Sequence, residues 1–435
     1  MSREQSSLSP VIETQPDENH DFRLVKETLM VGTVPQRIAS LILPPSSPIR
    51  LVPVQASTIT GKPVAPLETI ASDFQSQTGQ MPVAAVNGGM FLLAEYLADG
   101  AKRFYIDSPH RSRFGDPLGM VMIEGKIATP PIFGRPALAV TESGQVILTK
   151  GFTMNDIEIT TSDGLIIHPQ KINPPEINPD VVTVHTPNGE NKTDAPADSD
   201  RYYVTVIGHH VVATADQPSV VPTNGYIISL PDNRSYQDRL KEGTELNYQL
   251  VNQTGDPIRQ VLECGPLLVE NGQPLSINHQ TLIDQGFSPR SAPKPRFNSI
   301  FHHFDKSTPR TVIGQTADGS LVTVVFEGRQ TDSAGVTLEE AGRIMAEHYR
   351  CQTAIAFDGG ACAQLLVTNS DHDKLEPTVR RGAAKGRALV NGLMRLANSR
   401  LARQVGLIPP ETLPETDGAD RPISTAILFV RQPTL

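Results

Sequence analysis

Tryptophan is absent from this 435-residue sequence, and aromatic residues as a whole make up only 5% of the chain. Stacking against a ligand would therefore have to use Tyr, Phe or the plane of an arginine. Cysteine is scarce too, with only Cys264, Cys351 and Cys362. These three lie too far apart for a disulfide framework or a paired-cysteine metal site. We expect buried thiols and a reducing compartment.

Long hydrophobic runs are also lacking. No window reaches the ~18 apolar residues of a membrane span, and residues 1–20 hold no apolar run of signal-peptide length. We therefore expect a cytoplasmic protein with no membrane span. Acidic residues outnumber basic ones by 47 to 38, which gives a net charge of −9. Because this charge repels phosphate backbones and no basic stripe with interleaved aromatics is found in the main body, nucleic acid is not an expected partner.

Proline and glycine are abundant, with 37 and 33 residues, which indicates many turns rather than a helical bundle. From Phe22 onward, short apolar runs rich in β-branched residues alternate with turn residues. This pattern predicts an α/β (mixed α+β) fold, with a large, mostly mixed β-sheet core and a few helices. Helices are predicted at about 66–78 and 338–350, the second opened by a capping box of Thr337 and Glu340.

The chain divides into three regions by composition. Residues 1–20 predict a disordered acidic tail, and residues 21–372 plus 415–435 predict a single catalytic domain. Residues 373–414 predict a basic helical insertion before the last strand, because 377–410 holds seven basic residues and no acidic one. We expect this helix to pack on the domain or on a neighbouring subunit, so that a homo-oligomer through 377–410 is possible.

Two segments share one pattern: AAVNGGMF at 84–91 and AIAFDGGACAQLLV at 354–367. Each is an apolar strand followed by one polar side chain, Asn87 or Asp358, and then Gly-Gly. Glycine lacks a Cβ, so a ligand can approach its backbone amides closely. Either segment alone is also typical of a plain hairpin turn. Together they predict one concave site lined by Asn87, Arg310 and Asp358.

Further motifs follow in a defined order: PLGMVMIEGKI, GRPALAV, ECGPLLVENGQPL, TPRTVIG, VVFEGRQTDSAGVTLEEAGRIM and, after the second Gly-Gly segment, RPISTAILFV. This succession resembles the phosphodiester glycosidase family, from about residue 22 to 370 and again from 420 to 433. The resemblance implies a single domain of phosphodiester glycosidase type. It also implies hydrolysis of the bond between a sugar anomeric carbon and a phosphodiester, with a small-molecule or glycan phosphodiester as the substrate.

The resemblance also implies a set of site residues. The expected catalytic residues are Asp358, Arg310 and Asn87. The expected substrate-binding residues are Gly88, Gly89, Arg135, Gly265, Glu327, Arg329, Gly359 and Gly360. This chain departs from the family pattern at four positions. It has Met90 where Phe is common, Ala361 and Cys362 where Gly and Ser are common, and Glu327 where Asp is common.

The chemistry of the reaction favours these residue types. Cleavage of a glycosyl phosphodiester passes through an oxocarbenium-like state, so a carboxylate beside the anomeric carbon is useful. Asp358 would serve as nucleophile or as electrostatic stabiliser, and the sequence leaves both open. Arg310 is the expected phosphate clamp, because guanidinium binds two phosphate oxygens at once. Its alternative is an ion pair with a core carboxylate. Glu327 or Glu263 is a candidate second carboxylate, although an ordinary acid at a strand end is the favoured interpretation of each.

The sequence also leaves other functional classes and a metal ion open. No cofactor is expected to be required, and an oxygen-ligated divalent cation near Asp358 is left open. A catalytically silent protein that binds a glycosyl phosphate is one alternative to the hydrolase, because of the Ala361 and Cys362 departures. A scaffold role through the basic insertion is the other.

Overall fold

The computed structural model describes most of the chain. The described residues are 11–16, 21–92, 96–97, 111–112, 114–174, 178, 180–187, 201–222, 224–231, 234–251, 253, 255–287, 304–330, 332–369, 374–379 and 421–432. They fall into two compact units, whereas the sequence predicted a single domain. Unit 1 comprises Met1–Gly89, Gly265–Asn278 and His303–Leu435, and unit 2 comprises Met90–Cys264 and His279–His302. The division follows from the sheets, because each unit forms its own sheets.

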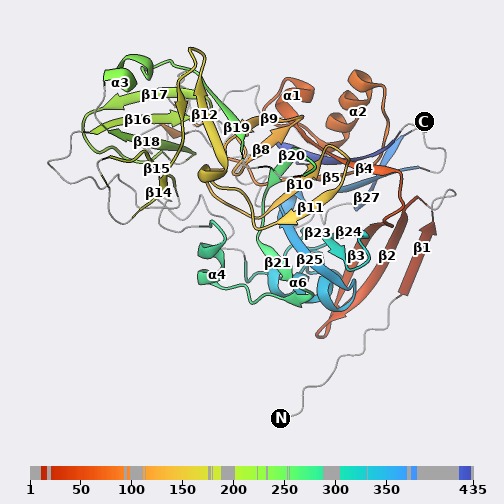
Figure 1. Cartoon of the computed structure of the whole chain (residues 1–435). Helices are drawn as coiled ribbons and strands as arrows, with labels where there is room; N and C mark the ends of the chain where they lie inside the picture. Colours follow the sequence, from red (N-terminus) through yellow and green to blue (C-terminus); the bar gives the residue numbers. More distant parts are fainter. Residues whose placement is uncertain are drawn as a thin grey trace, which may run out of the picture. The chain divides into compact units, whose positions relative to one another are not determined.

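An eight-stranded antiparallel sheet forms the larger part of unit 1 (Figure 1). Its strands, in spatial order, are β1 (Val11–Pro16), β2 (Arg23–Val31), β3 (Val34–Leu43), β24 (Leu321–Phe326), β23 (Arg310–Thr316), β25 (Cys351–Phe357), β21 (Leu267–Glu270) and β22 (Gln273–Pro274). Helix α6 (Leu338–Glu347) packs against β21, β23 and β25. It buries Leu338, Ala341 and Met345 at helical spacing.

A second, five-stranded antiparallel sheet completes unit 1. Its strands, in spatial order, are β27 (Leu375–Val379), β26 (Leu365–Thr368), β5 (Pro82–Asn87), β28 (Thr425–Arg431) and β4 (Ile49–Gln55). Helix α1 (Ala56–Thr60) contacts β4, and α2 (Leu67–Thr78) contacts β5 and β28. The central strands β5 and β28 are almost wholly buried, which explains why their sequences are continuous apolar runs rather than alternating ones.

Unit 2 contains two five-stranded sheets, a three-stranded sheet and a two-stranded ribbon among its described residues. The first five-stranded sheet has the order β11 (Val146–Thr149), β10 (Ala137–Thr141), β20 (Ile258–Glu263), β8 (Val121–Ile123), β9 (Lys126–Thr129). The second has the order β14 (Lys171–Ile172), β15 (Thr183–His185), β18 (Gly225–Pro231), β16 (Arg201–Ile207), β17 (His210–Ala215). The three-stranded sheet has the order β13 (Ile166–Ile167), β12 (Ile157–Thr161), β19 (Leu246–Leu250). The ribbon pairs β6 (Tyr96–Leu97) with β7 (Arg111–Ser112).

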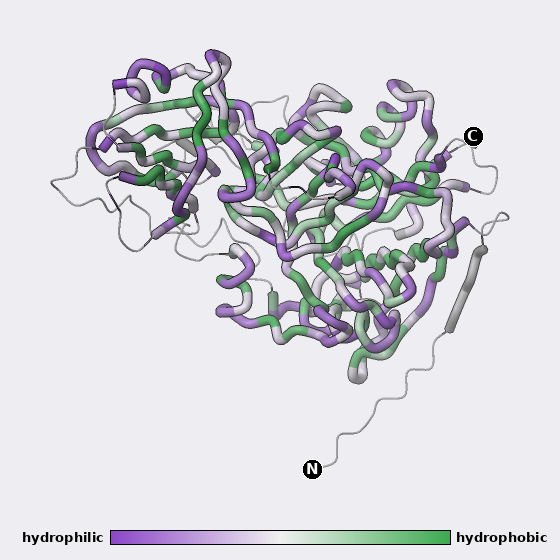
Figure 2. Tube along the Cα trace, in the orientation of Figure 1, coloured by the Kyte–Doolittle hydropathy of each residue, from purple (hydrophilic) through white to green (hydrophobic). Residues whose placement is uncertain are grey.

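The sheets of unit 2 share one hydrophobic core, which includes Met120, Ile159, Val204, Tyr226 and Val261. Figure 2 shows the corresponding hydrophobic stretches along the strands and hydrophilic residues at many of the turns. Strand β19 illustrates the cause, since its residues alternate between buried and exposed as period-two patterning requires. The short helical elements of this unit are η1 (Met154–Asp156), α3 (Arg234–Arg239) and α4 (His279–Asp284). The fold is therefore mostly β, with few helices.

Both predicted helices are confirmed. Helix α2 matches the 66–78 prediction, and α6 begins after the Thr337 cap. The Thr337 hydroxyl accepts from the Glu340 amide at 3.1 Å, and the Glu340 carboxylate accepts from the Thr337 amide at 2.8 Å. Glu340 is thus a capping residue, as the sequence indicated.

Two boundary predictions are wrong within the described residues. Val11–Pro16, expected to be disordered, forms strand β1 by pairing with β2. Leu375–Val379, expected to open the helical insertion, forms strand β27 by pairing with β26. In both cases an exposed sheet edge offers backbone hydrogen bonds that composition alone does not reveal. The basic segment from Arg380 to 420 lies outside the described residues. Within the described ranges, no helix is long and apolar enough to cross a membrane.

A buried carboxylate connects the N-terminal strands to the end of α6. Glu27 on β2 is only 6% exposed. It accepts from the Tyr349 hydroxyl at 2.6 Å, and Nε2 of His348 lies 3.1 Å from its Oε2. Burial acts to raise the pKa of Glu27. The hydrogen bonds from His348 and Tyr349 and the charges of His348 and Arg23 outweigh burial and lower the pKa overall.

Replacement of Glu27 by Gln should change how stability depends on pH. Because the folded-state pKa is lowered, the carboxylate stabilises the fold above the ordinary glutamate value of 4.5, and this stabilisation is lost as the pH falls through the folded pKa. We expect Glu27→Gln to cost about 1–3 kcal/mol at pH 7 and to flatten the acid side of the stability curve. Urea unfolding between pH 3 and 7 measures both effects.

Tyr349→Phe is the matched control, because it removes one hydrogen bond and keeps the carboxylate. It should lose stability at pH 7 yet retain an acid-dependent slope. Identical pH profiles for wild type and Glu27→Gln would contradict this account.

Candidate functional site

Asn87 lies at the end of β5, in contact with the turn that follows β25. Its side chain is fully buried. The Asn87 Oδ1 accepts from the Thr311 hydroxyl at 2.7 Å and from the Gln364 amide at 3.1 Å. Its Nδ2 donates to the Asp358 carbonyl at 2.7 Å and to the Gly88 carbonyl at 3.3 Å. All four hydrogen-bonding positions of the amide are used within the protein. Asn87 is therefore a positioning residue, and its predicted direct part in catalysis stays a prediction.

Gly88 and Gly89 pack against the beginning of β28. The Gly88 amide donates to the Thr425 carbonyl at 2.8 Å, and the Gly89 amide donates to the Thr425 hydroxyl at 2.9 Å. A Cβ on Gly88 would lie 2.5 Å from that hydroxyl oxygen. Glycine at position 88 is required for this close approach. The amides of Gly88 and Gly89 are already engaged, so the expectation that they bind substrate is not what the geometry favours.

Asp358 follows β25 directly and is partly buried. Its amide donates to the Gly88 carbonyl at 3.1 Å, and its Oδ1 accepts from the Gly359 amide at 2.9 Å. Burial raises the pKa of Asp358 above its ordinary value. A hydrogen bond from Cys362, the charge of Arg421, the Gly359 amide and the charge of Arg310 oppose this shift in part. The structure therefore brings Asn87 and Asp358 together and gives the carboxylate a strongly polar, largely enclosed environment.

Arg310 opens β23 and is only 6% exposed. Its Nε donates to the Val336 carbonyl at 3.2 Å and its Nη2 to the Lys306 carbonyl at 3.0 Å. Burial lowers the pKa of Arg310 to about 10, an effect that Asp358 opposes and Arg329 reinforces. The guanidinium remains charged at neutral pH. It acts on Asp358 through its field, while part of its donor set is occupied by backbone carbonyls.

Arg329 lies on the turn after β24, beside the second glycine of the DGG segment. A Cβ on Gly360 would lie 2.9 Å from Nη2 of Arg329. Gly360 has φ +65°, and Arg329 itself has φ +59°. A left-handed conformation is unusual for a non-glycine residue, and such strain is concentrated at functional sites. The turn that carries Arg329 thus places its guanidinium beside Gly360.

Glu327 holds that turn rather than facing the site. Its carboxylate accepts from Arg37 on β3, with Nε at 2.9 Å and Nη2 at 2.7 Å, and from Gln330 at 3.1 Å. Arg37 also bridges to Asp332 at 2.7 Å. These contacts do not test whether Glu327 binds substrate, which stays a prediction. It anchors the segment that carries Arg329.

Gly265 and Arg135 were also predicted to bind substrate, and both form contacts within the protein. The Gly265 amide donates to the Ala356 carbonyl at 2.9 Å, two residues before Asp358. Arg135 belongs to unit 2, where its guanidinium stacks between the rings of Phe133 and Phe287 at 4.4 Å from each centroid. Its Nη1 donates to the Leu118 carbonyl at 2.6 Å, and burial lowers the pKa of Arg135 to about 10. The contacts of Arg135 are those of a core cation, not of a substrate ligand.

Glu263 is likewise a core group of unit 2. Its carboxylate accepts from the Met120 amide at 2.8 Å, and burial raises its pKa to about 8. Gly359 lies in unit 1 beside Arg310, and its missing Cβ leaves room for the Pro309 carbonyl at 2.8 Å. Gly359 therefore lies beside Arg310 in unit 1, whereas the contacts of Glu263 described above lie within unit 2.

The sequence analysis missed several residues around Asp358. They are Thr308, Thr311, Cys362, Gln364, Arg421 and Thr425. The one signal for Arg421 was its place in the motif RPISTAILFV, just before β28. The others carry no signal in isolation, because threonine and glutamine are ordinary in strands and turns.

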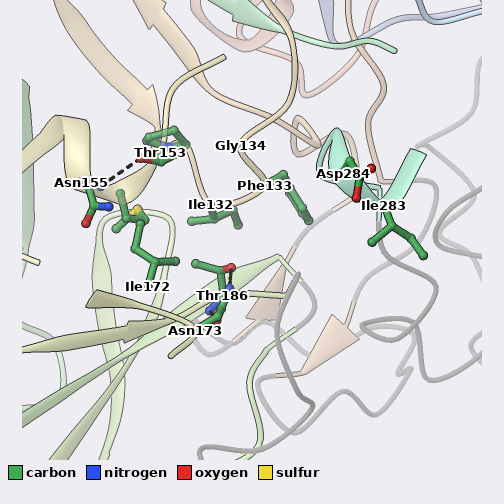
Figure 3. Close-up of a pocket in the computed structure, with 13 residues that line it drawn as sticks. Ile132, Phe133, Gly134, Thr153, Asn155, Ile172, Asn173, Thr186, Ile283 and Asp284 are labelled. Atoms are coloured by element: carbon green, nitrogen blue, oxygen red, sulfur yellow. Dashed lines mark hydrogen bonds between the residues drawn. The ribbon is translucent and has the colours of Figure 1, made fainter. Parts of the chain in front are cut away.

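A separate cavity of about 320 Å³ lies within unit 2 (Figure 3). Apolar side chains such as Ile132, Phe133 and Ile172 line it. Its polar side includes Asn173 and Thr186, which form two hydrogen bonds with each other. Nδ2 of Asn173 donates to Oγ1 of Thr186 at 2.8 Å, and the Thr186 amide donates to Oδ1 of Asn173 at 2.8 Å. It contains none of the predicted site residues.

The site and fold define a mostly β protein with one carboxylate set among arginines at strand ends. The family model described as phosphodiester glycosidase (NAGPA) matches residues 200–395. The family resemblance expected from the motifs is thus confirmed over that range, which contains Arg310, Arg329 and Asp358. No curated protein matches the chain.

Several solved structures are similar to the chain. One is a hypothetical protein from Synechocystis, with 20% identity, a TM-score of 0.53, and 97% of this chain covered. The chain spans 64% of that protein's length, and the likeness shows a shared fold alone. A putative exported protein from Burkholderia pseudomallei K96243 has 19% identity and a TM-score of 0.47, covering 91% and 74% of the two chains. The zebrafish N-acetylglucosamine-1-phosphodiester alpha-N-acetylglucosaminidase catalytic domain, auto-inhibited by its pro-peptide, has 12% identity and a TM-score of 0.41, covering 98% and 83%.

Removal of the Asn87 amide should destabilise unit 1 severely. Asn87→Ala leaves the Thr311 hydroxyl, the Gln364 amide and the Asp358 carbonyl without their partner, and each such buried group costs about 1–3 kcal/mol. We expect a total loss of about 3 kcal/mol or more in urea unfolding. Thr311→Val removes only one of these bonds and should cost about 1 kcal/mol. Equal costs for the two variants would refute the central role of Asn87.

Proposed function

We propose that this chain is a glycosidase-type hydrolase that cleaves the bond between a sugar anomeric carbon and a phosphodiester. The observation that carries the proposal is the Asp358 carboxylate, which is enclosed at a strand end under the influence of Arg310 and Arg421, with Arg329 beside the same turn. The family match over residues 200–395 supports a hydrolase of this class. Bond cleavage gives the free sugar and a phosphomonoester, with water as the second substrate.

The role of Asp358 follows from charge. As the bond from the anomeric carbon to oxygen breaks, positive charge develops on the sugar and the electron pair moves to the phosphate oxygen. A carboxylate beside the anomeric carbon stabilises that positive charge. Its interaction is strong because the group is shielded from water by its surroundings.

The arginines take the phosphate side of the reaction. A phosphate leaving group is a weak base, so it needs charge stabilisation more than protonation. We propose that Arg329, which is partly exposed, binds the phosphate oxygens, and that the field of buried Arg310 supports it. This arrangement replaces the clamp role expected for Arg310 with a shared one.

A catalytically silent glycosyl-phosphate-binding protein is the second candidate. Cys362 favours this candidate, because it stands where the family commonly has Ser. Its side chain forms a hydrogen bond with Asp358. A panel of chromogenic sugar phosphodiesters separates the two candidates. Turnover supports the hydrolase, and a ligand-induced thermal shift without turnover supports the binding protein.

Asp358→Asn should separate activity from stability. Because the folded-state pKa is raised, the ionised carboxylate disfavours the folded state at pH 7 relative to a neutral side chain. We expect the variant to be as stable as wild type or more so, and to lose about 10²-fold or more in kcat/KM. Asp305→Asn, at an exposed position, is the control and should keep full activity. Near wild-type turnover by folded Asp358→Asn would remove Asp358 from catalysis.

The pH profile gives a related prediction. Activity requires ionised Asp358, so kcat/KM should rise with pH through an apparent pKa above 3.8, the ordinary aspartate value. Initial rates between pH 3.5 and 8 measure the midpoint. An acid limb at or below 3.8 would contradict the enclosed carboxylate.

Metal removal tests the cofactor expectation. Among the described residues, no group of three or more His, Cys, Asp or Glu side chains is placed to hold a metal ion. We propose that turnover requires no divalent cation, and we expect it to survive EDTA treatment and desalting unchanged. Loss of turnover that magnesium or calcium restores would reverse this proposal.

A further inference from the structure

Thr308 carries a buried hydroxyl that has no hydrogen-bond partner within the described part of the chain. The residue is 9% exposed, and its Oγ1 is unpaired. Both backbone groups of Thr308 are used, since its amide donates to the Val336 carbonyl at 3.2 Å and its carbonyl accepts from the Val336 amide at 3.1 Å. An unpaired buried hydroxyl costs free energy, which a ligand that accepts its hydrogen bond would recover.

The Thr308 hydroxyl lies close to the turn that contains Gly360. The Cβ that Gly360 lacks would lie 2.9 Å from Nη2 of Arg329 and 3.9 Å from Oγ1 of Thr308. The turn at Gly360 therefore lies in close contact with the Arg329 guanidinium, and the Thr308 hydroxyl lies next to the same turn. The Gly360 amide donates to the Pro309 carbonyl at 2.8 Å, which fixes this turn against the segment that carries Thr308.

We propose that Thr308 is a substrate-contact residue whose hydroxyl donates a hydrogen bond to a non-bridging phosphate oxygen of the substrate, beside Arg329. The proposal rests on the function proposed above and identifies the group that recognises its phosphate. A guanidinium and a hydroxyl around a glycine match an anionic, multi-oxygen group better than a neutral sugar hydroxyl, because the guanidinium supplies charge. Arg310, electrostatically coupled to Arg329, adds to the positive potential.

Other unpaired threonine hydroxyls occur in the fold, and one provides a matched control. Thr323 lies on β24 in the same unit, is fully buried and has an unpaired Oγ1. It pairs with Ile313 and Leu41 inside the eight-stranded sheet. Thr323→Val therefore makes the same chemical change as Thr308→Val, away from the Gly360 turn.

The experiment compares Thr308→Val, Thr308→Ser and Thr323→Val with wild type. Calorimetric titration with α-glucose 1-phosphate and inorganic phosphate measures Kd, and the sugar phosphodiester panel measures KM and kcat. We expect Thr308→Val to raise Kd and KM about 10-fold or more, as for a lost hydrogen bond to a charged group, with a smaller change in kcat. Thr308→Ser should restore binding, Thr323→Val should bind normally, and neither valine variant should lose stability.

Gly360→Ala adds an independent arm. Its added Cβ would lie 2.9 Å from Nη2 of Arg329, so it should weaken phosphate binding by displacing that guanidinium. Gly61→Ala is its control, since Gly61 has φ +70° with nothing within 4 Å of the added Cβ. Both substitutions place an alanine at a positive φ and should therefore introduce similar backbone strain. Only Gly360→Ala should affect phosphate binding.

The outcomes distinguish this inference from the proposed function. Unchanged Kd and KM in Thr308→Val, with turnover still dependent on Asp358, would overturn the role of Thr308 and leave the hydrolase intact. Phosphate binding that depends on Thr308, without turnover in wild type, would support the role of Thr308 and overturn the hydrolase. Absence of both binding and turnover in wild type would overturn both.

Discussion

The buried amide of Asn87 is the interaction on which the site of unit 1 depends. It joins the end of β5 in the five-stranded sheet to β23 of the eight-stranded sheet, through the Thr311 hydroxyl. The same amide fixes the turns before and after η2 (Gly360–Cys362), through the Asp358 carbonyl and the Gln364 amide. A side chain with two donor and two acceptor positions can satisfy four partners at once. Its removal would leave several buried groups unpaired.

The hydrogen bonds of Asn87 help to determine where the charged groups of the site lie. The Asp358 backbone is held by Asn87 and Gly88, so its partly buried carboxylate stays under the influence of Arg310 and Arg421. Arg329 is held by a different means, the pairing of Glu327 with Arg37 on β3. The hydrogen bonds of Asn87 and the ion pair between Glu327 and Arg37 thus hold Asp358 and Arg329 in place. Preorganised charge of this kind is effective because it needs no rearrangement during the reaction.

Many of the residues named from motifs lie where the motifs suggested, but their contacts differ from the expected ones. Gly88 lies in close contact with Thr425 of β28, and Glu327 pairs with Arg37. Arg135 stacks in the core of unit 2. A motif shows that a position needs a glycine, a cation or a carboxylate. It does not show whether the requirement comes from packing or from a ligand, because both select the same residue types.

The sequence by itself determined the features that depend on neighbours along the chain. These are the short strands with β-branched runs, the helix near 338–347 with its Thr337 and Glu340 cap, and the Gly-Gly turns after β5 and β25. Only the tertiary structure decided the two units, the positioning role of Asn87 and the free hydroxyl of Thr308. The physical reason is the sequence separation of the partners. Asn87 bonds residues 224, 271 and 277 positions away, and no local pattern specifies which of many buried polar groups will meet across sheets.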